Sequence, residues 1–118
     1  MNYVLDLDDR PFKAIKAGTK KIEGRTPTSW DKTPYEKLKE GDLIHFVNIV
    51  SNEEMDVEVK FIHHYSDVRT MLEQEGVENV LSGNPKTIEH GIGSYNSIDE
   101  YKEAIIKNGI YAIRIKPL

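Results

Sequence analysis

Three charged side chains lie close together in the sequence, in a segment that could support ligand binding or catalysis. Lys20, Glu23 and Arg25 follow Gly18, and the pattern predicts a tight turn at the glycine and a strand over residues 20–25. Side chains two apart on a strand point to the same face, so Glu23 and Arg25 should lie side by side. Ordered and partly desolvated, the three groups could hold a polar or anionic ligand. On an exposed strand, the same charges would form an ion-pair ladder that contributes little to stability.

The amine of Lys20 has two alternative chemical roles. A lysine that is desolvated in a cleft can act as a general base, because burial lowers its pKa. An adjacent carboxylate has the opposite effect, and Glu23 is close in the sequence. We expect Glu23 to raise the pKa of Lys20 and to keep the amine charged. The local pattern therefore favours recognition over base catalysis. Lys20 and Arg25 would then meet anionic or carbonyl oxygens of a ligand, with Glu23 orienting the two cations.

Aromatic side chains near these charges are candidates for stacking on a ligand. Trp30 is the only tryptophan and lies in a loop rich in Pro, Ser and Thr, directly after the charged segment. Stacking of a nucleobase on such a ring contributes about 1–3 kcal/mol. The alternative is that Trp30 anchors its loop by plugging the core. Tyr65 and Tyr95 carry the same two interpretations, and cations interleaved with such aromatics would suit single-stranded RNA or one splayed nucleotide.

The composition limits the class of protein. A chain of 118 residues has room for one core, so we expect one domain over residues 1–118. The absence of cysteine excludes disulfides, thiolate metal sites and cysteine nucleophiles. The histidines lack metal-ligand spacing and no glycine-rich phosphate loop is present, so we predict neither a metal nor a cofactor. We find no signal peptide and no apolar run near the roughly 20 residues that span a bilayer. We expect a soluble, cytoplasmic protein without membrane contacts.

Charge is distributed unevenly along the chain. The overall net charge is −4, which argues weakly against a nucleic-acid binder. Residues 10–39, however, carry nine Lys or Arg and three acidic residues, whereas the rest of the chain carries seven bases and seventeen acids. Such asymmetry can create a basic face on an acidic body, and a basic face attracts anionic ligands. Ordinary solvated lysines are the alternative interpretation.

Hydrophobic periodicity and turn signals predict an α+β fold. The expected strands cover residues 3–7, 20–25, 43–50, 55–62 with an extension toward 65, and 110–116. We expect helices from a cap at residue 8 or 9 to Gly18, over about 34–38, and from a cap at 66 or 67 to Gly76. A single turn from Thr87 to Gly91 and a helix from Ser97 to Asn108 follow. Capping-box patterns at residues 33–36 and 97–100 introduce the helix over about 34–38 and the helix that ends at Asn108. The type of residues 77–81 is left open. About five or six strands with helices between them predict a mostly antiparallel β-barrel with peripheral helices.

Five blocks of the sequence, taken in order, resemble the ASCH domain family. The first is Gly18-x-Lys20-x-x-Glu23-x-Arg25, after a helix that opens with Pro11-Phe12. The others are Lys39-Glu40-Gly41-Asp42-x-Ile44-x-Phe46-x-Asn48, the segment from Tyr65 through Met71-Leu72-x-x-Glu75-Gly76, residues 83–95, and Gly109-Ile110-Tyr111-Ala112-Ile113-Arg114-Ile115. The resemblance covers essentially the whole chain, and the order and spacing of the blocks carry it.

This resemblance implies a fold, a ligand class and a set of site residues. The family implies a PUA-like β-barrel with a cleft beside the Lys-Glu-Arg strand, and binding of RNA or a small nucleoside-like ligand. Lys20, Glu23 and Arg25 would bind it, with Trp30, Tyr65 and Tyr95 as candidate stacking residues.

The family also implies an alternative function. Some small bacterial members are amidohydrolases that act on N4-acetylcytidine through a Lys, a Thr and a Glu. Lys20 matches the Lys, and Glu75 is the match for the Glu, so these two are the catalytic candidates if the protein is a hydrolase. Glu23 occupies the Thr position, and the absence of that hydroxyl weakens the hydrolase interpretation. Glu23 or Glu75 would then have to activate the attacking water.

Overall fold

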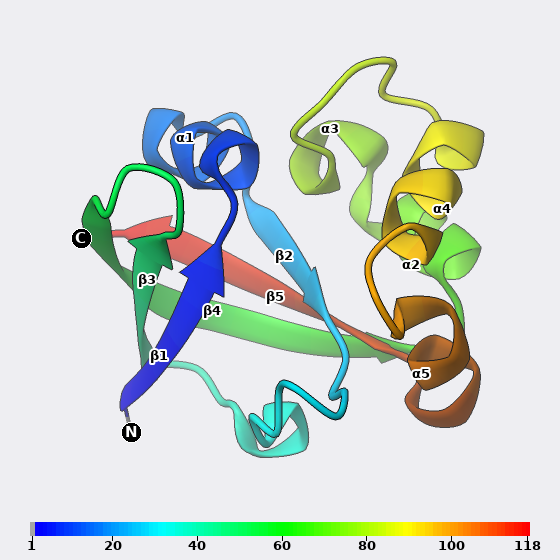
Figure 1. Ribbon diagram of the computed structural model, residues 1–118, viewed down its shortest axis with the longest axis horizontal. Coiled ribbons are helices and arrows are strands. Elements are labelled where there is room, and N and C mark those ends of the chain that lie inside the picture. Colours follow the sequence, from blue (N-terminus) through cyan, green and yellow to red (C-terminus); the bar gives the residue numbers. More distant parts are fainter. Residues whose placement is uncertain (1) are drawn as a thin grey trace.

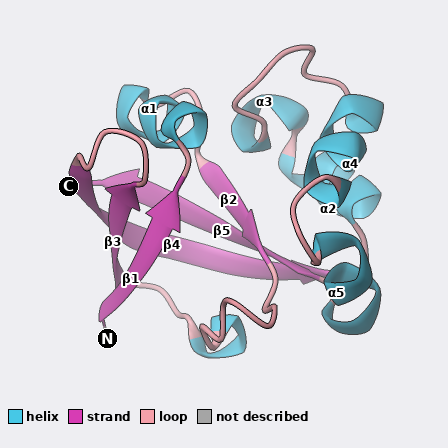
Figure 2. Ribbon diagram, viewed as in Figure 1, coloured by secondary structure: helices cyan, strands magenta, loops and turns pink. Residues whose placement is uncertain are grey.

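A curled five-stranded sheet forms the body of the protein, and most of its helices lie against the outer face. The computed structural model describes residues 2–118. The strands are β1 (Asn2–Leu7), β2 (Ile22–Arg25), β3 (Leu43–Asn48), β4 (Glu54–Tyr65) and β5 (Ile110–Pro117). The helices are α1 (Asp9–Ala17), the 3-10 turn η1 (Tyr35–Lys37), α2 (Val68–Glu75), α3 (Val77–Val80), α4 (Ile88–Asn96) and α5 (Tyr101–Asn108). Figure 1 shows α2–α5 gathered on one side and α1 at the other end, and Figure 2 separates the helices from the sheet by colour. Within residues 2–118, no helix has the length and apolar character needed to cross a membrane.

The predicted α+β class is confirmed, and the sheet is a half-barrel. The strand order is β1-β3-β4-β5-β2, with β1 parallel to β3 and the other pairs antiparallel. The edge strands β1 and β2 share no ladder in the part of the chain that is described, so hydrogen bonding does not close the sheet into the expected barrel. A side chain bridges this gap instead, because Arg25 on β2 donates from Nη2 to the backbone oxygen of Asp6 on β1 at 2.7 Å.

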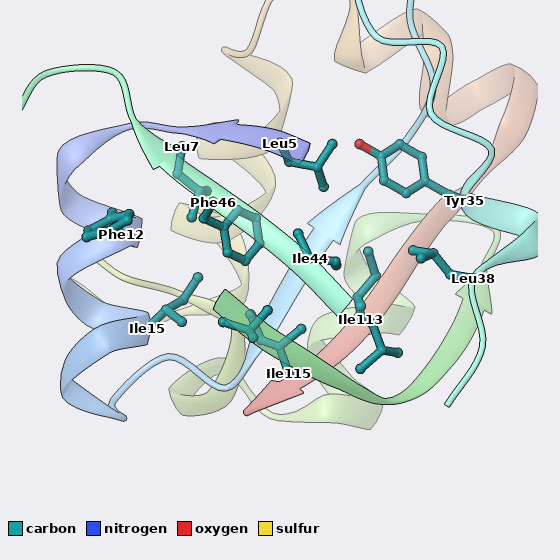
Figure 3. Packing of buried hydrophobic residues seen from close by; sticks show 12 residues of the cluster. Leu5, Leu7, Phe12, Ile15, Tyr35, Leu38, Ile44, Phe46, Ile113 and Ile115 are labelled. Carbon is teal, nitrogen blue, oxygen red and sulfur yellow. The ribbon is translucent and has the colours of Figure 1, made fainter. Parts of the chain in front are cut away.

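Two apolar cores lie on opposite faces of the sheet. Inside the curl, Ile113 and Ile115 of β5 pack with Phe46 and Ile44 of β3 and with Phe12 of α1 (Figure 3). On the outer face, alternate residues of β5 meet the side chains of α2–α5. Because successive strand residues point to opposite faces, β5 supplies both cores and separates them. This arrangement leaves β2 between α1 and the helices α2–α5 (Figure 1).

The first helix forms as its sequence predicts. The Asp8 side chain caps α1 by accepting from the amide of Asp9 at 2.8 Å, and Gly18 ends the helix in the left-handed region at φ 83°. Asp67 likewise caps α2 by accepting from the amide of Thr70 at 2.7 Å. These local signals fix where the chain turns toward β2 and where it leaves β4.

The prediction that Gly91 ends a single helical turn is wrong. Helix α4 continues through Gly91 to Asn96. A Cβ atom at position 91 would lie 2.6 Å from Cδ1 of Leu72 and 3.1 Å from Cδ2 of Leu81. Gly91 therefore allows α4 to approach its neighbours closely, and a glycine used for packing does not stop a helix.

Neither predicted capping box forms. The Thr33 hydroxyl donates to Asp31 at 2.7 Å, and the residues that follow make only the 3-10 turn η1. The Ser97 hydroxyl donates to the backbone oxygen of Ser94 at 2.6 Å, so α5 begins later, at Tyr101. Glu100 precedes α5 with φ 66° and no side-chain cap. Its carboxylate accepts from the hydroxyl and, at 3.1 Å, from the amide of Ser29, and it therefore ties the loop after β2 to α5.

A surface cluster of His45, Asp56 and Glu54 makes the stability of the protein depend on pH. His45 of β3 lies between Asp56 and Glu54 of β4, with 2.6 Å from Nδ1 to Asp56 Oδ1 and 2.6 Å from Nε2 to Glu54 Oε1. These hydrogen bonds raise the pKa of His45, and the one to Asp56 has the largest effect. A raised folded-state pKa stabilises the protein below the unfolded pKa of about 6.5, and this contribution is lost as pH rises through the folded pKa. We expect His45→Gln to lower the melting temperature at pH about 6 and to have less effect as the pH is raised. A difference that does not change with pH would contradict this.

Candidate functional site

A cleft of about 490 Å³ opens beside β2, at the gap between the two edge strands. The end of β1 and the start of α1 form one side of it, and residues of α3, α4 and α5 form the other. The charged residues of β2 lie between these two sides. Its size falls in the range of about 300–1,000 Å³ that is typical of small-molecule sites.

The predicted charged trio lies in this cleft and is buried. Lys20, Glu23 and Arg25 are 5%, 7% and 7% exposed, which excludes the exposed ion-pair ladder. The Glu23 carboxylate accepts from Arg25 Nε at 2.8 Å through Oε2, and its Oε1 is 3.3 Å from Lys20 Nζ. Glu23 and Arg25 pair with Ile113 and Tyr111 of β5, so both point to the inner face of the half-barrel. The carboxylate therefore holds two cations at once.

Hydrogen bonds of Lys20 fix its amine in place. Nζ donates to the backbone oxygen of Ile22 at 2.7 Å and to that of Val80 at the end of α3. Burial lowers the pKa of Lys20, and the charge of Glu23 offsets this only in part. Glu23 raises the pKa of Lys20 as expected, but burial lowers it by more, so the net pKa lies below the ordinary value. Desolvation of a fully buried amine outweighs one neighbouring carboxylate.

Glu23 and Arg25 keep their charges. Burial alone would raise the pKa of Glu23, but Lys20 and Arg25 outweigh it and the pKa is lowered. Burial disfavours the charged guanidinium as well, yet Glu23 holds the pKa of Arg25 above its ordinary value. Arg25 Nη1 also lies 3.8 Å from Asp31 Oδ2. The site therefore presents an ionised carboxylate whose charge is balanced by the cations around it.

Three parallel aromatic rings line the opposite side of the cleft. Tyr95 and Tyr101 stack with centroids 6.5 Å apart and planes 7° apart, and Trp30 stacks on Tyr101 at 6.1 Å and 12°. Trp30 is 53% exposed, so it does not plug the core. Burial raises the pKa of Tyr95 and, to about 12, that of Tyr101, so both hydroxyls stay neutral. The link between Ser29 and Glu100 holds the loop that carries Trp30.

Gly24 lets this aromatic row approach β2. A Cβ atom at position 24 would lie 2.5 Å from the Tyr95 hydroxyl oxygen and 2.9 Å from Cζ of the same ring. Tyr95 is buried at 7% exposure, so its ring has little room to move away. The glycine therefore allows the ring of Tyr95, which comes from α4, to lie against β2.

The structure brings together most of the predicted site residues. Lys20, Glu23, Arg25, Trp30 and Tyr95 all line the cleft. Residues that the sequence interpretation did not select also line it, among them Asp6, Asp8, Arg10, His90, Ser94 and Tyr101. Asp8 was considered only as a helix cap, and no local pattern shows that Asp8 or Tyr101 faces a cavity.

Two of the predicted residues lie elsewhere. Glu75 and Tyr65 are absent from the cleft lining and contact each other, because the Tyr65 hydroxyl donates to Glu75 Oε2. His63 Nδ1 lies 2.6 Å from the same oxygen. These residues join the end of β4 to α2. Glu75 is therefore not positioned to act together with Lys20, and any acidic group that acts beside Lys20 must be a different one.

Comparisons with known proteins agree with the family resemblance. The family model for the ASCH domain matches residues 5–118. The crystal structure of hypothetical protein PH0355 is 37% identical, with 100% of each chain covered and a TM-score of 0.82. The solution NMR structure of protein PF0455 from Pyrococcus furiosus is 38% identical, covers 100% of this chain and 98% of that chain, and has a TM-score of 0.71. No curated protein matches. The chain belongs to the ASCH domain family.

Proposed function

We propose that the cleft binds a nucleoside-like ligand, either free or as an unpaired nucleotide of RNA, in a domain of PUA-like type. One observation carries the proposal: an ionised, buried carboxylate and a row of stacked aromatic rings line the same cleft. A hydrogen-bonding group beside a flat apolar surface is what recognition of a nucleobase requires. The family resemblance favours the same ligand class.

The hydrogen bonds of the site favour a ligand group that donates. Lys20 directs its amine to two backbone oxygens and to Glu23, which uses the three donors of an ammonium group. Arg25 is engaged with Glu23 and with Asp6. The Glu23 carboxylate retains acceptor capacity, since a carboxylate offers about four lone-pair sites. The Glu23 carboxylate can therefore accept from the amino group of a nucleobase. A phosphate is a poorer match, because the donors of Lys20 and Arg25 are already engaged.

The entrance of the cleft favours a planar ring. Three exposed or partly exposed apolar side chains line it, namely Trp30, Ile49 and Ile98. A base whose amino edge reaches Glu23 would lie against this surface. Apolar lining with a few placed polar groups is the usual composition of a small-molecule site.

Replacement of Trp30 tests the stacking part of the proposal. We expect Trp30→Ala to weaken nucleoside binding by about 1–3 kcal/mol, which corresponds to about 5- to 150-fold in Kd. The side chain is half exposed, so stability should change little. Isothermal titration calorimetry with cytidine, adenosine, guanosine and uridine measures the effect. Ile106→Ala is the matched control, because Ile106 is 79% exposed and does not line the cleft.

A thermal-shift screen precedes this titration. A ligand that prefers the native state raises the melting temperature, by an amount that grows with the ratio of its concentration to its Kd. If none of the four nucleosides and no short RNA shifts the melting temperature, the proposed function is wrong. Equal losses in Trp30→Ala and Ile106→Ala would contradict stacking on Trp30 but not binding itself.

A second candidate function is hydrolysis of N4-acylated cytidine. The lowered pKa of Lys20 favours it, because a buried amine that can lose its proton is suited to act as a general base. In this reaction Lys20 would take a proton from water, and the hydroxide oxygen would bond to the acyl carbon. The C–N bond would break as Lys20 passes that proton to N4, and the carboxylic acid formed would lose its own proton to solvent. Cytidine and a carboxylate are the products. Since Glu75 lies outside the cleft, the Glu23 carboxylate, 3.3 Å from Lys20 Nζ, would be the acidic residue that acts with the amine.

Turnover of N4-acetylcytidine checks this candidate. We expect release of cytidine and acetate, measured by chromatography, at a rate that rises with pH as Lys20 loses its proton. Lys20→Met should abolish the release. Lys21→Met is the control, because Lys21 is the exposed neighbour in the sequence. Absence of turnover in the wild type, together with nucleoside binding, would leave a binding domain only.

A further inference from the structure

A second hollow, of about 420 Å³, lies where β2 begins and β5 ends. Five of its lining residues are cations: Lys20, Lys21, Lys60, Arg114 and Lys116. The remaining lining residues are apolar or glycine, and none is acidic. This basic hollow therefore differs from the cleft, in which acidic and basic side chains balance.

The fold brings these cations together from distant parts of the sequence. Arg114 and Lys116 are two apart on β5, so they share a face and lie about 7 Å apart along the strand. Lys21 lies next to them, because its backbone oxygen accepts from the amide of Ile115 at 3.1 Å. Lys60 lies at the irregularity in β4 between Val59 and Phe61, where the register with β5 shifts.

Most of this positive charge is not compensated. Lys60 Nζ is 2.8 Å from Glu58 Oε1. Glu58 is also the residue opposite Lys116 in the ladder, but its carboxylate pairs with Lys60. The side chains of Lys21, Arg114 and Lys116 have no ion pair or hydrogen bond within residues 2–118. Three unpaired cations around one concavity concentrate positive potential there.

We infer that the basic hollow is a binding site for phosphoryl groups, distinct from the cleft although Lys20 lines both, and independent of the ligand that the cleft takes. A ligand with several negative charges matches several cations that no single carboxylate could neutralise. Arg114 adds a planar donor pair that suits two phosphate oxygens, and the lysines act as point charges. The net charge of the chain is −4, so a polyanion would be repelled by most of the surface and directed to this hollow. Free polyphosphate and the backbone of an RNA chain share this chemistry.

A charge-removal triple variant tests the site. We expect Lys21→Gln/Arg114→Gln/Lys116→Gln to weaken binding of tripolyphosphate or of a labelled ten-nucleotide RNA by at least about tenfold at low salt. For the RNA, the slope of log K against log salt should also fall in magnitude by about 2, since each single-strand phosphate contact contributes about 0.7. The matched control is Lys37→Gln/Lys102→Gln/Lys107→Gln, which removes the same charge from exposed lysines outside the hollow.

The outcomes separate this site from the cleft. Binding of either probe that is lost in the first triple variant and retained in the control supports the inference. The probe that binds more tightly per phosphate shows whether the phosphoryl groups come from free polyphosphate or from an RNA backbone. Failure of both probes to bind the wild type at low salt, or equal losses in the two triple variants, overturns it. The nucleoside affinity of the first triple variant should be unchanged. If the wild type binds tripolyphosphate, loses it in the first triple variant, and binds neither a nucleoside nor a short RNA, the proposed function is overturned and the basic hollow is supported.

Discussion

Replacing Glu23 with Gln is expected to destabilise the protein by about 3–5 kcal/mol, because the change removes one partner of a buried ion network and leaves its cations unneutralised. Glu23 is buried at 7% exposure and contacts both Lys20, at 3.3 Å, and Arg25, at 2.8 Å. The amide of glutamine keeps the shape but not the charge. Urea unfolding at constant pH measures the loss.

Glu58→Gln is the matched control for this change. Glu58 also pairs with a lysine at 2.8 Å, but both side chains are partly exposed, and an exposed pair contributes at most about 1 kcal/mol. If Glu23→Gln costs no more than Glu58→Gln, the buried carboxylate does not neutralise the cleft. A double variant of Glu23→Gln with Lys20→Met should cost less than the sum of its single changes, because each removes the same pair.

Replacing Gly24 with Ala is expected to destabilise the protein by about 1–3 kcal/mol and to reduce nucleoside binding. The added methyl group would lie 2.5 Å from the Tyr95 hydroxyl oxygen, a distance that the structure has to relieve by moving the ring. Movement of Tyr95 would disturb its stacking on Tyr101 and so the row that ends in Trp30. Unfolding in urea and titration with the tightest nucleoside measure the two effects.

Gly93→Ala is the control for this change. Gly93 lies in α4 near Tyr95, and a Cβ atom there would meet nothing within 4 Å. Alanine in a helix is favoured over glycine by about 0.5–1 kcal/mol, so this variant should be slightly more stable. Changes of the same sign in Gly24→Ala and Gly93→Ala would show that the close approach of Tyr95 to β2 does not constrain the site.

The cations of the basic stretch of the sequence are divided between the cleft and the basic hollow. The basic stretch of residues 10–39 does not form one basic face. Lys20 and Arg25 from this stretch are buried in the cleft, and Lys13 and Lys16 pair with Asp9 and Glu53. Lys21 joins cations from β4 and β5 in the basic hollow instead. Counts of charge along the sequence therefore predicted attraction of anions, but they did not predict where on the molecule the cations gather.

Local signals in the sequence determined the strands, the first caps and the charged segment. Alternation in β4, the Asp8 cap and the turn at Gly18 act between neighbouring residues, so they can be read without the fold. The predicted capping boxes do not form, because the Thr33 and Ser97 hydroxyls donate to other nearby residues. Gly91 does not end its helix, because it allows close packing against Leu72 and Leu81, and Leu72 is distant in the sequence.

The chemistry of the site depends on contacts that form only when the whole chain has folded. The positions of Lys20, Glu23 and Arg25 in the sequence predicted a charged group in which Glu23 raises the pKa of Lys20. Glu23 does so, but burial of the amine lowers its pKa by more. The fold also placed Tyr101 beside Trp30 and removed Glu75 from the cleft. Desolvation and contacts between distant segments depend on how the whole chain packs, and no short stretch of sequence contains that information.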